Sequence, residues 1–358
     1  MRPTYAEVDL TAVKHNVAAF VALVAPSQVC VVVKADAYGH GDVPIATAAL
    51  DAGAAWLAVA LVAEGIRLRE AGIEAPILVL SEPEPGSAPD VAEWDLTPTV
   101  YSIPFAEALT ATGASLQAHV KVDTGMHRVG AAPEQVDDVI RVLRASHNVE
   151  VAALWTHLAV ADEDREFTLR QIELFEEVVA RHEAAMTHVA NTAGAALFPE
   201  ARQSLCRIGL GTYGLHPCPQ TRDVVDLLPA MRVVSHVSHV QHLEAGARPS
   251  YGRIRPLPGQ AHVATVAIGY ADGYPRRLSA EGRVLIAGQR RPLAGIVTMA
   301  QIMVDVGPDV VAVGDEVVLL GSQDGVEVTA DEWARLLGTI SYEVVSGIGP
   351  RVPRRYVE

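Results

Sequence analysis

Eight short apolar runs, rich in β-branched residues, recur through the first two thirds of the chain, and helical segments separate most of them. This alternation is typical of a parallel sheet built from βα units. Eight such units are the number that closes a (β/α)8 barrel. We therefore predict an α/β fold with an N-terminal TIM-type barrel. The predicted strands are residues 29–34, 56–61, 77–81, 97–102, 117–122, 151–156, 187–191 and 205–208.

The pattern changes near residue 231, where β-branched runs broken by Gly, Pro and Asp replace the βα rhythm. This texture is typical of a small, mainly antiparallel β domain. We expect residues 1–230 to form the barrel and residues 231–358 to form the second domain. Within it, residues 284–293 resemble two strands joined by a glycine turn. Three histidines spaced three apart over 236–242 would face alternate sides of a strand, so no metal site is predicted.

The charge and composition of the chain exclude some classes of binding partner. The formal net charge of -15 argues against nucleic acid and against an anionic membrane surface, since both require a basic footprint. No basic and apolar leader follows the first residue, and no apolar run reaches the ~18 residues of a membrane span. Cys30, Cys206 and Cys218 show no CxxC spacing, which favours a reducing compartment. We expect a cytoplasmic enzyme that acts on a small molecule.

Lys34 stands at the end of an apolar run, just before a polar turn rich in glycine. Burying an ammonium group is costly unless its pKa falls or the amine becomes covalently neutral, and such an amine is suited to forming a Schiff base. Pyridoxal 5'-phosphate (PLP) is the usual carbonyl partner. The alternative is a lysine that begins a loop and extends into solvent.

Other polar residues also follow predicted strands. The segment 121–128 follows the fifth strand, His157 ends the sixth, Asn191 and Thr192 end the seventh, and Arg207 belongs to the eighth. In barrels of this kind the chemistry gathers at the carboxyl ends of the strands. These residues are therefore expected to share one rim with Lys34.

Six motifs, in order along the chain, resemble those of the alanine racemases, which are fold-type III PLP enzymes. Among them are Val-Lys-Ala-Asp-Ala-Tyr-Gly-His-Gly, Lys-Val-Asp-Thr-Gly-Met-His-Arg and Ile-Gly-Tyr-Ala-Asp-Gly-Tyr-Pro-Arg. The resemblance covers essentially the whole chain. The motifs occupy residues 33–41, 121–128, 156–159, 250–253, 268–276 and 342–344.

The resemblance implies a PLP-dependent racemase that interconverts L- and D-alanine by a two-base mechanism and supplies D-alanine for peptidoglycan. Lys34 would hold PLP and serve one face of the substrate α-carbon, and Tyr251 would serve the opposite face. Arg207 would face the pyridine nitrogen, which stays unprotonated because a guanidinium does not give up its proton. The resemblance also implies a homodimer with shared active sites.

The same resemblance assigns the remaining site residues. Arg128, Met299 and Tyr270 would contact or admit the substrate, and Lys121 resembles a lysine that is often carbamylated. The residues implied to bind the cofactor are Lys34, Tyr38, His157, Asn191, Thr192, Arg207, Gly209, Leu210 and Tyr342.

Two positions depart from the family pattern. The family usually has Arg where this chain has Ile296, and Asp where it has Ala300. Both lie near the predicted substrate entrance, so a racemase of broader specificity, acting on serine or 2-aminobutyrate, is an alternative. A PLP homeostasis protein would lack the second domain and Tyr251. A fold-type III decarboxylase would carry a cysteine motif in the second domain, but no cysteine follows Cys218.

Overall fold

The computed structural model describes residues 3–358, which form two compact units. The barrel unit comprises Thr11–Ala37 and Asp42–Leu228. The β unit comprises the residues up to Leu10, Tyr38–Gly41 and Pro229–Glu358. The N-terminal strand belongs to the β unit because it pairs with strands there.

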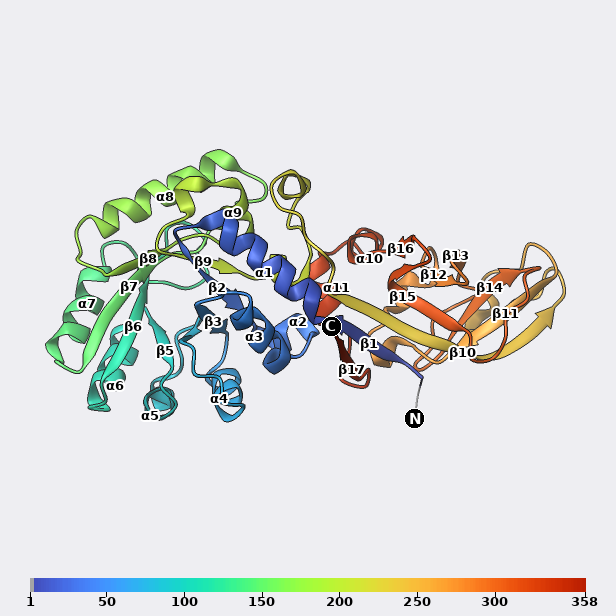
Figure 1. Ribbon diagram of the computed structural model, residues 1–358, viewed down its shortest axis with the longest axis horizontal. Helices are drawn as coiled ribbons and strands as arrows, with labels where there is room; N and C mark the ends of the chain where they lie inside the picture. Colours follow the sequence, from blue (N-terminus) through green and yellow to red (C-terminus); the bar gives the residue numbers. More distant parts are fainter. Residues whose placement is uncertain (1–2) are drawn as a thin grey trace. The chain divides into compact units, whose positions relative to one another are not determined.

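Eight parallel strands form the barrel in the order β8, β7, β6, β5, β4, β3, β2, β9 (Figure 1). The two end strands also meet, because the Ser204 amide donates to the Thr187 carbonyl at 3.0 Å and the Arg207 amide donates to the Ala190 carbonyl at 3.0 Å. The predicted barrel is thus confirmed. The strands are β2 (Gln28–Val32), β3 (Trp56–Val59), β4 (Ile77–Val79), β5 (Thr97–Val100), β6 (Leu116–Lys121), β7 (Val149–Trp155), β8 (Met186–His188) and β9 (Leu205–Ile208).

Helices surround these strands (Figure 1). The first, α1, buries Val13, Val17 and Phe20, whose spacing is that of one helical face. Side-chain oxygens of Ser102 and Asp164 accept backbone N–H bonds at the starts of α6 and α8. The helices are α1 (Leu10–Val24), α3 (Asp42–Asp51), α4 (Val62–Glu70), α5 (Ala88–Glu93), α6 (Ile103–Ala111), α7 (Val136–Ala145), α8 (Arg165–Val179) and α9 (Thr192–Leu197).

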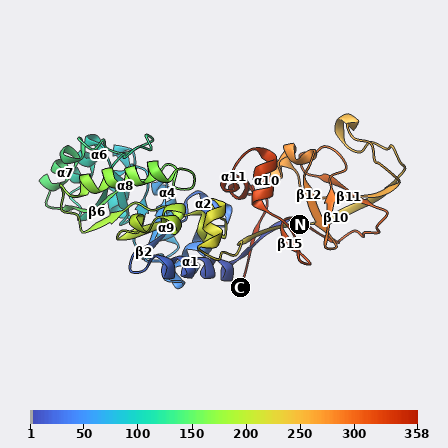
Figure 2. The ribbon, with the colours of Figure 1, turned by 90° about the horizontal axis from the view of Figure 1, so that it is seen from above.

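The β unit is a mainly antiparallel sheet (Figure 2), in which only the pairing of β1 with β17 is parallel among the described strands. The expected hairpin is β12 and β13, and its turn uses positive φ at Ala287 and Gly288. Two helices, α10 (Ala330–Leu337) and α11 (Ser341–Ser346), complete the unit. The strands are β1 (Tyr5–Asp9), β10 (Met231–Leu243), β11 (Ala261–Val266), β12 (Arg283–Ile286), β13 (Gln289–Pro292), β14 (Ile302–Gly307), β15 (Glu316–Gln323), β16 (Val326–Val328) and β17 (Arg354–Val357).

Within residues 3–358, no helix combines the length and the apolar character that crossing a bilayer requires.

The short helix α2 (Lys34–Gly39) is left-handed. Ala35, Asp36, Ala37 and Tyr38 all have φ between 51° and 54°, and Gly39 has φ of 81°. A left-handed helical residue other than glycine costs roughly 1–2 kcal/mol, because its Cβ crowds the following carbonyl. This turn was not predicted, since none of its first four residues favours the conformation. It begins at Lys34, so the strain lies directly beside the expected catalytic lysine.

Hydrogen bonds within the barrel unit hold the first residues of this turn. The Ala35 amide donates to Glu64 Oε1 at 2.7 Å, and the Ala37 amide donates to the Val33 carbonyl at 2.8 Å. The other carboxylate oxygen of Glu64 accepts from the amides of Ala60 and Leu61 at 2.8 and 3.1 Å. One carboxylate therefore ties the start of α4 to the residue after Lys34.

We expect Ala35→Gly to stabilise the protein. Removing the Cβ relieves the left-handed strain of roughly 1–2 kcal/mol, and the flexibility of glycine returns roughly 0.5–1 kcal/mol of that gain. The free energy of unfolding, measured by urea denaturation, should rise by about 0.5–1 kcal/mol. Ala18 is the matched control, because it is also exposed but lies within the right-handed helix α1. Ala18→Gly should lower the same quantity by about 1 kcal/mol. Equal losses in the two variants would contradict the strain argument.

Candidate active site

The barrel unit brings five of the expected site residues together, four of them at the carboxyl ends of strands and Arg128 in the segment that follows β6. Lys34 follows β2, Lys121 ends β6, His157 follows β7 and Arg207 lies in β9. Their charges act on one another: Arg128 lowers the pKa of Lys34, and Arg207, Arg128 and Lys34 all lower the pKa of Lys121. This mutual influence means that the five side chains form one cluster, which we call the cationic rim.

Burial is the main cause that lowers the pKa of Lys34, and the Arg128 guanidinium adds to it. The Glu64 carboxylate opposes both by raising the pKa. A lowered pKa increases the fraction of neutral amine, which is the form that attacks a carbonyl or removes a proton. The chemistry expected of Lys34 is therefore favoured by its surroundings. Glu64 itself was missed, because a glutamate in the first turn of a helix is an ordinary feature.

Lys121 is buried, with only 4% of its surface exposed. Burial, followed by the charges of Arg207 and Arg128, lowers its pKa to about 7, while Asp123 acts in the opposite direction. Its Nζ lies 4.3 Å from the centre of the Trp155 ring. This amine is therefore neutral at pH 7 far more often than an ordinary solvated lysine would be.

Arg207 is 2% exposed and is surrounded by acceptors. Its Nη2 donates to the carbonyls of Thr156 and Val189 at 2.8 and 2.9 Å and to His157 Nδ1 at 3.2 Å. Burial lowers its pKa to about 10, which leaves the guanidinium charged at neutral pH. Burial and the charge of Arg207 also lower the pKa of His157 well below its usual value, so this imidazole is neutral.

Hydroxyl and N–H groups gather near the ends of β8 and β9. Thr192 Oγ1 accepts from the amides of Gly209 and Gly211 at 3.1 and 3.4 Å. A Cβ on Gly211 would lie 2.4 Å from the Phe20 ring, so only glycine fits this close packing. Leu210 is buried beside them, and Asn191 begins α9 by accepting from the Gly194 amide at 2.9 Å.

Tyr38 and Tyr342 lie together in the β unit, with ring centres 6.0 Å apart. Burial, followed by the neighbouring Tyr342, raises the pKa of Tyr38. Its hydroxyl therefore keeps its proton and can donate a hydrogen bond. Hydroxyl donors of this kind suit a phosphate, which is a group that PLP carries.

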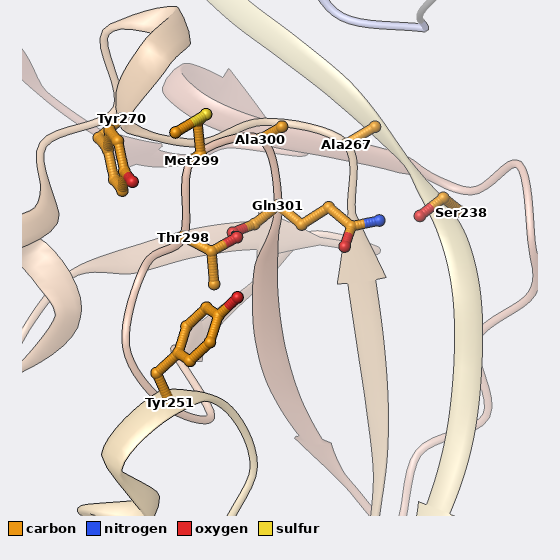
Figure 3. Close-up of a pocket in the computed structure, with 8 residues that line it drawn as sticks. All are labelled: Ser238, Tyr251, Ala267, Tyr270, Thr298, Met299, Ala300 and Gln301. Carbon is orange, nitrogen blue, oxygen red and sulfur yellow. The ribbon is translucent and has the colours of Figure 1, made fainter.

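The remaining expected site residues, Tyr251, Tyr270 and Met299, line one pocket of the β unit with a volume of about 570 Å³ (Figure 3). The Tyr251 hydroxyl points towards Thr298 and Gln301 in this view. Among the described residues, no charged side chain lines the pocket. Its lining residues are Ser238, Tyr251, Ala267, Tyr270, Thr298, Met299, Ala300 and Gln301.

A strained turn carries Tyr251. Ser250 has φ of 70° and Arg253 has φ of 46°, with Gly252 at 68° between them. The Ser250 hydroxyl donates to the Ile296 carbonyl at 2.7 Å, which fixes this turn against the segment that carries Ile296. The sequence marked Tyr251 by its motif but gave no signal for this conformation, since serine rarely adopts positive φ.

Two buried histidines of the barrel, His119 and His188, were also missed as neighbours of the site. His188 Nδ1 accepts from Arg207 Nη1 at 2.7 Å. A polar residue inside an apolar strand is the signal that could have found them, because a buried imidazole requires a partner.

Comparison with known proteins agrees with this geometry. Residues 8–217 match the family described as alanine racemase, N-terminal domain, and residues 230–356 match alanine racemase, C-terminal domain. An alanine racemase of Symbiobacterium thermophilum is 47% identical over 99% of this chain and 97% of its own length.

Solved structures have the same fold. The alanine racemase of Streptomyces lavendulae superposes with a TM-score of 0.94 at 36% identity, covering 100% of this chain and 98% of that one. A histidine racemase from Leuconostoc mesenteroides has a TM-score of 0.91 at 28% identity, covering 100% and 98%. Because both domains match in order and a full-length relative is nearly half identical, the chain belongs to the alanine racemase family.

Proposed function

We propose that this chain racemises alanine with Lys34 and Tyr251 as its two bases. The single observation that carries the proposal is the lysine of lowered pKa on the cationic rim, in a chain whose family depends on PLP. The product D-alanine would serve peptidoglycan synthesis, and the enzyme would work in the cytoplasm.

We expect residues of each unit to hold the cofactor. Lys34 would bind its aldehyde carbon, Arg207 would face its ring nitrogen, and His157 and Asn191 would border it. When bound, PLP withdraws electrons and so acidifies the α C–H bond of an amino acid. Arg207 keeps its own protons at neutral pH and would leave the ring nitrogen unprotonated, which would weaken this withdrawal and favour prompt return of the proton. The phosphate donors are Tyr38, Thr192, Tyr342 and the backbone N–H groups of Gly209 and Leu210.

Two groups would hold the substrate carboxylate: the Arg128 guanidinium and the backbone N–H of Met299. Tyr270 would line the path of entry. Lys34 Nζ would then exchange a proton with one face of the α-carbon, and Tyr251 Oη with the other. Lys121, with its pKa of about 7, is suited to carbamylation, because carbon dioxide reacts with the neutral amine. A carbamate there would be an anion beside Arg128 and would attract it.

The Tyr251 side chain must be shielded from water before it can act as a base. It is 73% exposed, and Met299, Ile254 and Tyr270 around it are 58%, 54% and 44% exposed. A base that removes a proton from carbon works best where water is excluded. We infer that a second copy of the chain covers this surface, so that Tyr251 of each subunit serves Lys34 of the other.

Mixing two inactive variants tests the two bases and the dimer together. In a 1:1 mixture of Lys34→Ala and Tyr251→Phe chains, half of the dimers are hybrids, and each hybrid has one complete site if sites are shared. Alanine racemisation should return to about a quarter of the wild-type rate, as random pairing in a two-fold dimer requires. The control mixture pairs Lys34→Ala with the Lys34→Ala/Tyr251→Phe double variant and should stay inactive. Subunit exchange without any recovered activity would rule out shared sites.

A broader substrate range is the second candidate function. The residues found to line the Tyr251 pocket within 3–358 are all uncharged, and Ala300 contributes to its wall. Ile296 lies beside it, since a Cβ on Gly252 would be 3.7 Å from Ile296 Cδ1. A histidine racemase shares the fold at 28% identity, so the scaffold admits a side chain larger than methyl in that protein.

We expect the Ile296→Arg/Ala300→Asp variant to narrow this range. Hydrophobic pockets discriminate by about 1 to 3 kcal/mol per methylene, so the ratio of serine or 2-aminobutyrate turnover to alanine turnover should fall about ten-fold. The control variant Val310→Asp/Val313→Arg adds the same charges at exposed positions of the β unit that do not line the pocket. An unchanged turnover ratio in the Ile296→Arg/Ala300→Asp variant would contradict the proposal of a broader substrate range and leave alanine as the preferred substrate.

A further inference from the structure

Two histidines extend the hydrogen bonds of Arg207 into the interior of the barrel. Arg207 Nη1 lies 2.7 Å from His188 Nδ1, and His188 Nε2 lies 3.0 Å from His119 Nδ1. All three side chains are almost completely buried, at 2% exposure or less. Neither His119 nor His188 has a role in the reaction as described above.

Arg207 dictates where the protons of both histidines lie. A guanidinium has only donors, so His188 Nδ1 must be the acceptor. A neutral imidazole with Nδ1 as acceptor carries its proton on Nε2, and His188 therefore donates to His119 Nδ1. The same rule then places the proton of His119 on Nε2. The opposite order would put an N–H of His188 against an N–H of Arg207.

Both imidazoles are neutral, as this order requires. Burial, followed by the charge of Arg207, lowers the pKa of His119 to about 3 and that of His188 well below its usual value. The last member of this hydrogen-bonded series has a free-energy cost, because His119 Nε2 is buried and has no hydrogen-bond partner among residues 3–358. An apolar side chain would fill the same space without this cost.

Aromatic rings hold the histidines in place. His188 stacks on Trp155 with ring centres 5.3 Å apart and an angle of 13°, and the Arg207 guanidinium lies 4.6 Å from the same ring. His119 packs against Trp56 at 5.2 Å. Backbone carbonyls fix Nη2 of Arg207, whereas His188 is the acceptor that fixes Nη1.

We propose that His188 is a positioning residue for Arg207, and that Arg207, His188 and His119 form a relay with both histidine protons fixed on Nε2. The relay sets the rotation of the guanidinium. In the activity that we propose, this rotation decides how Arg207 faces the cofactor ring. The part of the proposal that concerns function therefore rests on the proposed function, whereas the proton positions do not.

Neutron diffraction from crystals of the deuterated holoenzyme tests the proton positions directly. We expect deuterium on Nε2 and none on Nδ1 at both His188 and His119, at pH 6 and at pH 8. Deuterium on Nδ1 of His188, or on both nitrogens, would overturn the relay. This measurement does not depend on catalysis, so it stands even if the enzyme prefers another substrate or uses other bases.

Variants of His188 test the positioning role. His188→Asn keeps an acceptor near the position of Nδ1, whereas His188→Leu keeps the bulk and removes it. Because a misplacement of about 1 Å can cost 10²-fold in rate, we expect His188→Leu to lower kcat about 100-fold with little change in KM. His188→Asn should recover most of that loss. His262→Leu is the control, since it replaces a half-buried histidine of the β unit.

Crystal structures of the variants separate positioning from folding. In the His188→Leu variant the Arg207 guanidinium should be rotated, and in the His188→Asn variant it should keep its wild-type orientation. A His188→Leu variant with full kcat, or an Asn variant as impaired as the Leu variant with Arg207 unmoved, would refute the positioning role. If His188→Leu does not fold, the Asn variant and the neutron structure still decide the question.

Discussion

Replacing Tyr251 by phenylalanine is expected to slow racemisation strongly while one enantiomer of alanine still exchanges its α-proton with solvent. The variant keeps the ring in the pocket of the β unit and removes only the hydroxyl. A positioned acid or base contributes typically about 10²–10⁴ in rate, so racemisation should fall by about that factor. In the proposed mechanism Lys34 would still remove and return a proton on its own face of the α-carbon. Exchange without inversion should therefore survive for one enantiomer only.

The measurement is deuterium uptake from D2O into L-alanine and, separately, into D-alanine, followed by NMR and by chiral chromatography. Tyr270→Phe is the matched control, because Tyr270 lines the same pocket and is also partly exposed. It should change KM more than kcat and should keep exchange in both enantiomers. Equal loss of exchange in both enantiomers of the Tyr251→Phe variant would argue against a two-base mechanism.

The barrel could be predicted from the alternation of apolar runs and helical segments, because each of its strands is a buried run between such segments. The N-terminal strand β1 was not predicted, because it forms by pairing with residues more than 200 positions away. Val8 pairs with Met231, and Ala6 pairs with Arg354. Such pairing leaves no local mark on a five-residue segment. The hairpin of β12 and β13 was predictable for the opposite reason, because its turn residues lie within the segment itself.

The site shows the same division between local and distant causes. Motifs identified Lys34, Arg207 and Tyr251, but not the groups that set their properties. Glu64 reaches back to the Ala35 amide across 29 residues, and His188 reaches Arg207 from the neighbouring strand. The left-handed turn at 35–38 is imposed on alanine, aspartate and tyrosine by such contacts against their own preferences. Local sequence cannot reveal a conformation that local preference opposes.

The chain has only three lysines, Lys14, Lys34 and Lys121, which makes the assignment of the cofactor lysine unusually easy to test. Borohydride reduction of the holoenzyme should fix the pyridoxyl group on the amine that binds it. Peptide mapping is expected to find the label on Lys34. Lys14 pairs with Asp51 on the outer helices and provides the internal control for unspecific labelling. Lys121 is the lysine that could also react with the cofactor, because its pKa of about 7 makes its amine nucleophilic.

Lys34→Ala is expected to have the largest effect of any single change. It would remove both the proposed covalent attachment and one of the two proposed bases, so racemisation should fall by about 10⁴-fold or more. Lys121→Ala leaves both functions in place and should retain far more activity, although Arg128 loses a neighbour. The variants of these two lysines should differ in labelling. After borohydride reduction the Lys121→Ala enzyme should still carry the pyridoxyl group, and the Lys34→Ala enzyme should not. Label on Lys121 in the Lys34→Ala enzyme, together with residual racemisation, would mean that the cationic rim can support the chemistry from either lysine and that Lys34 is favoured only by its position.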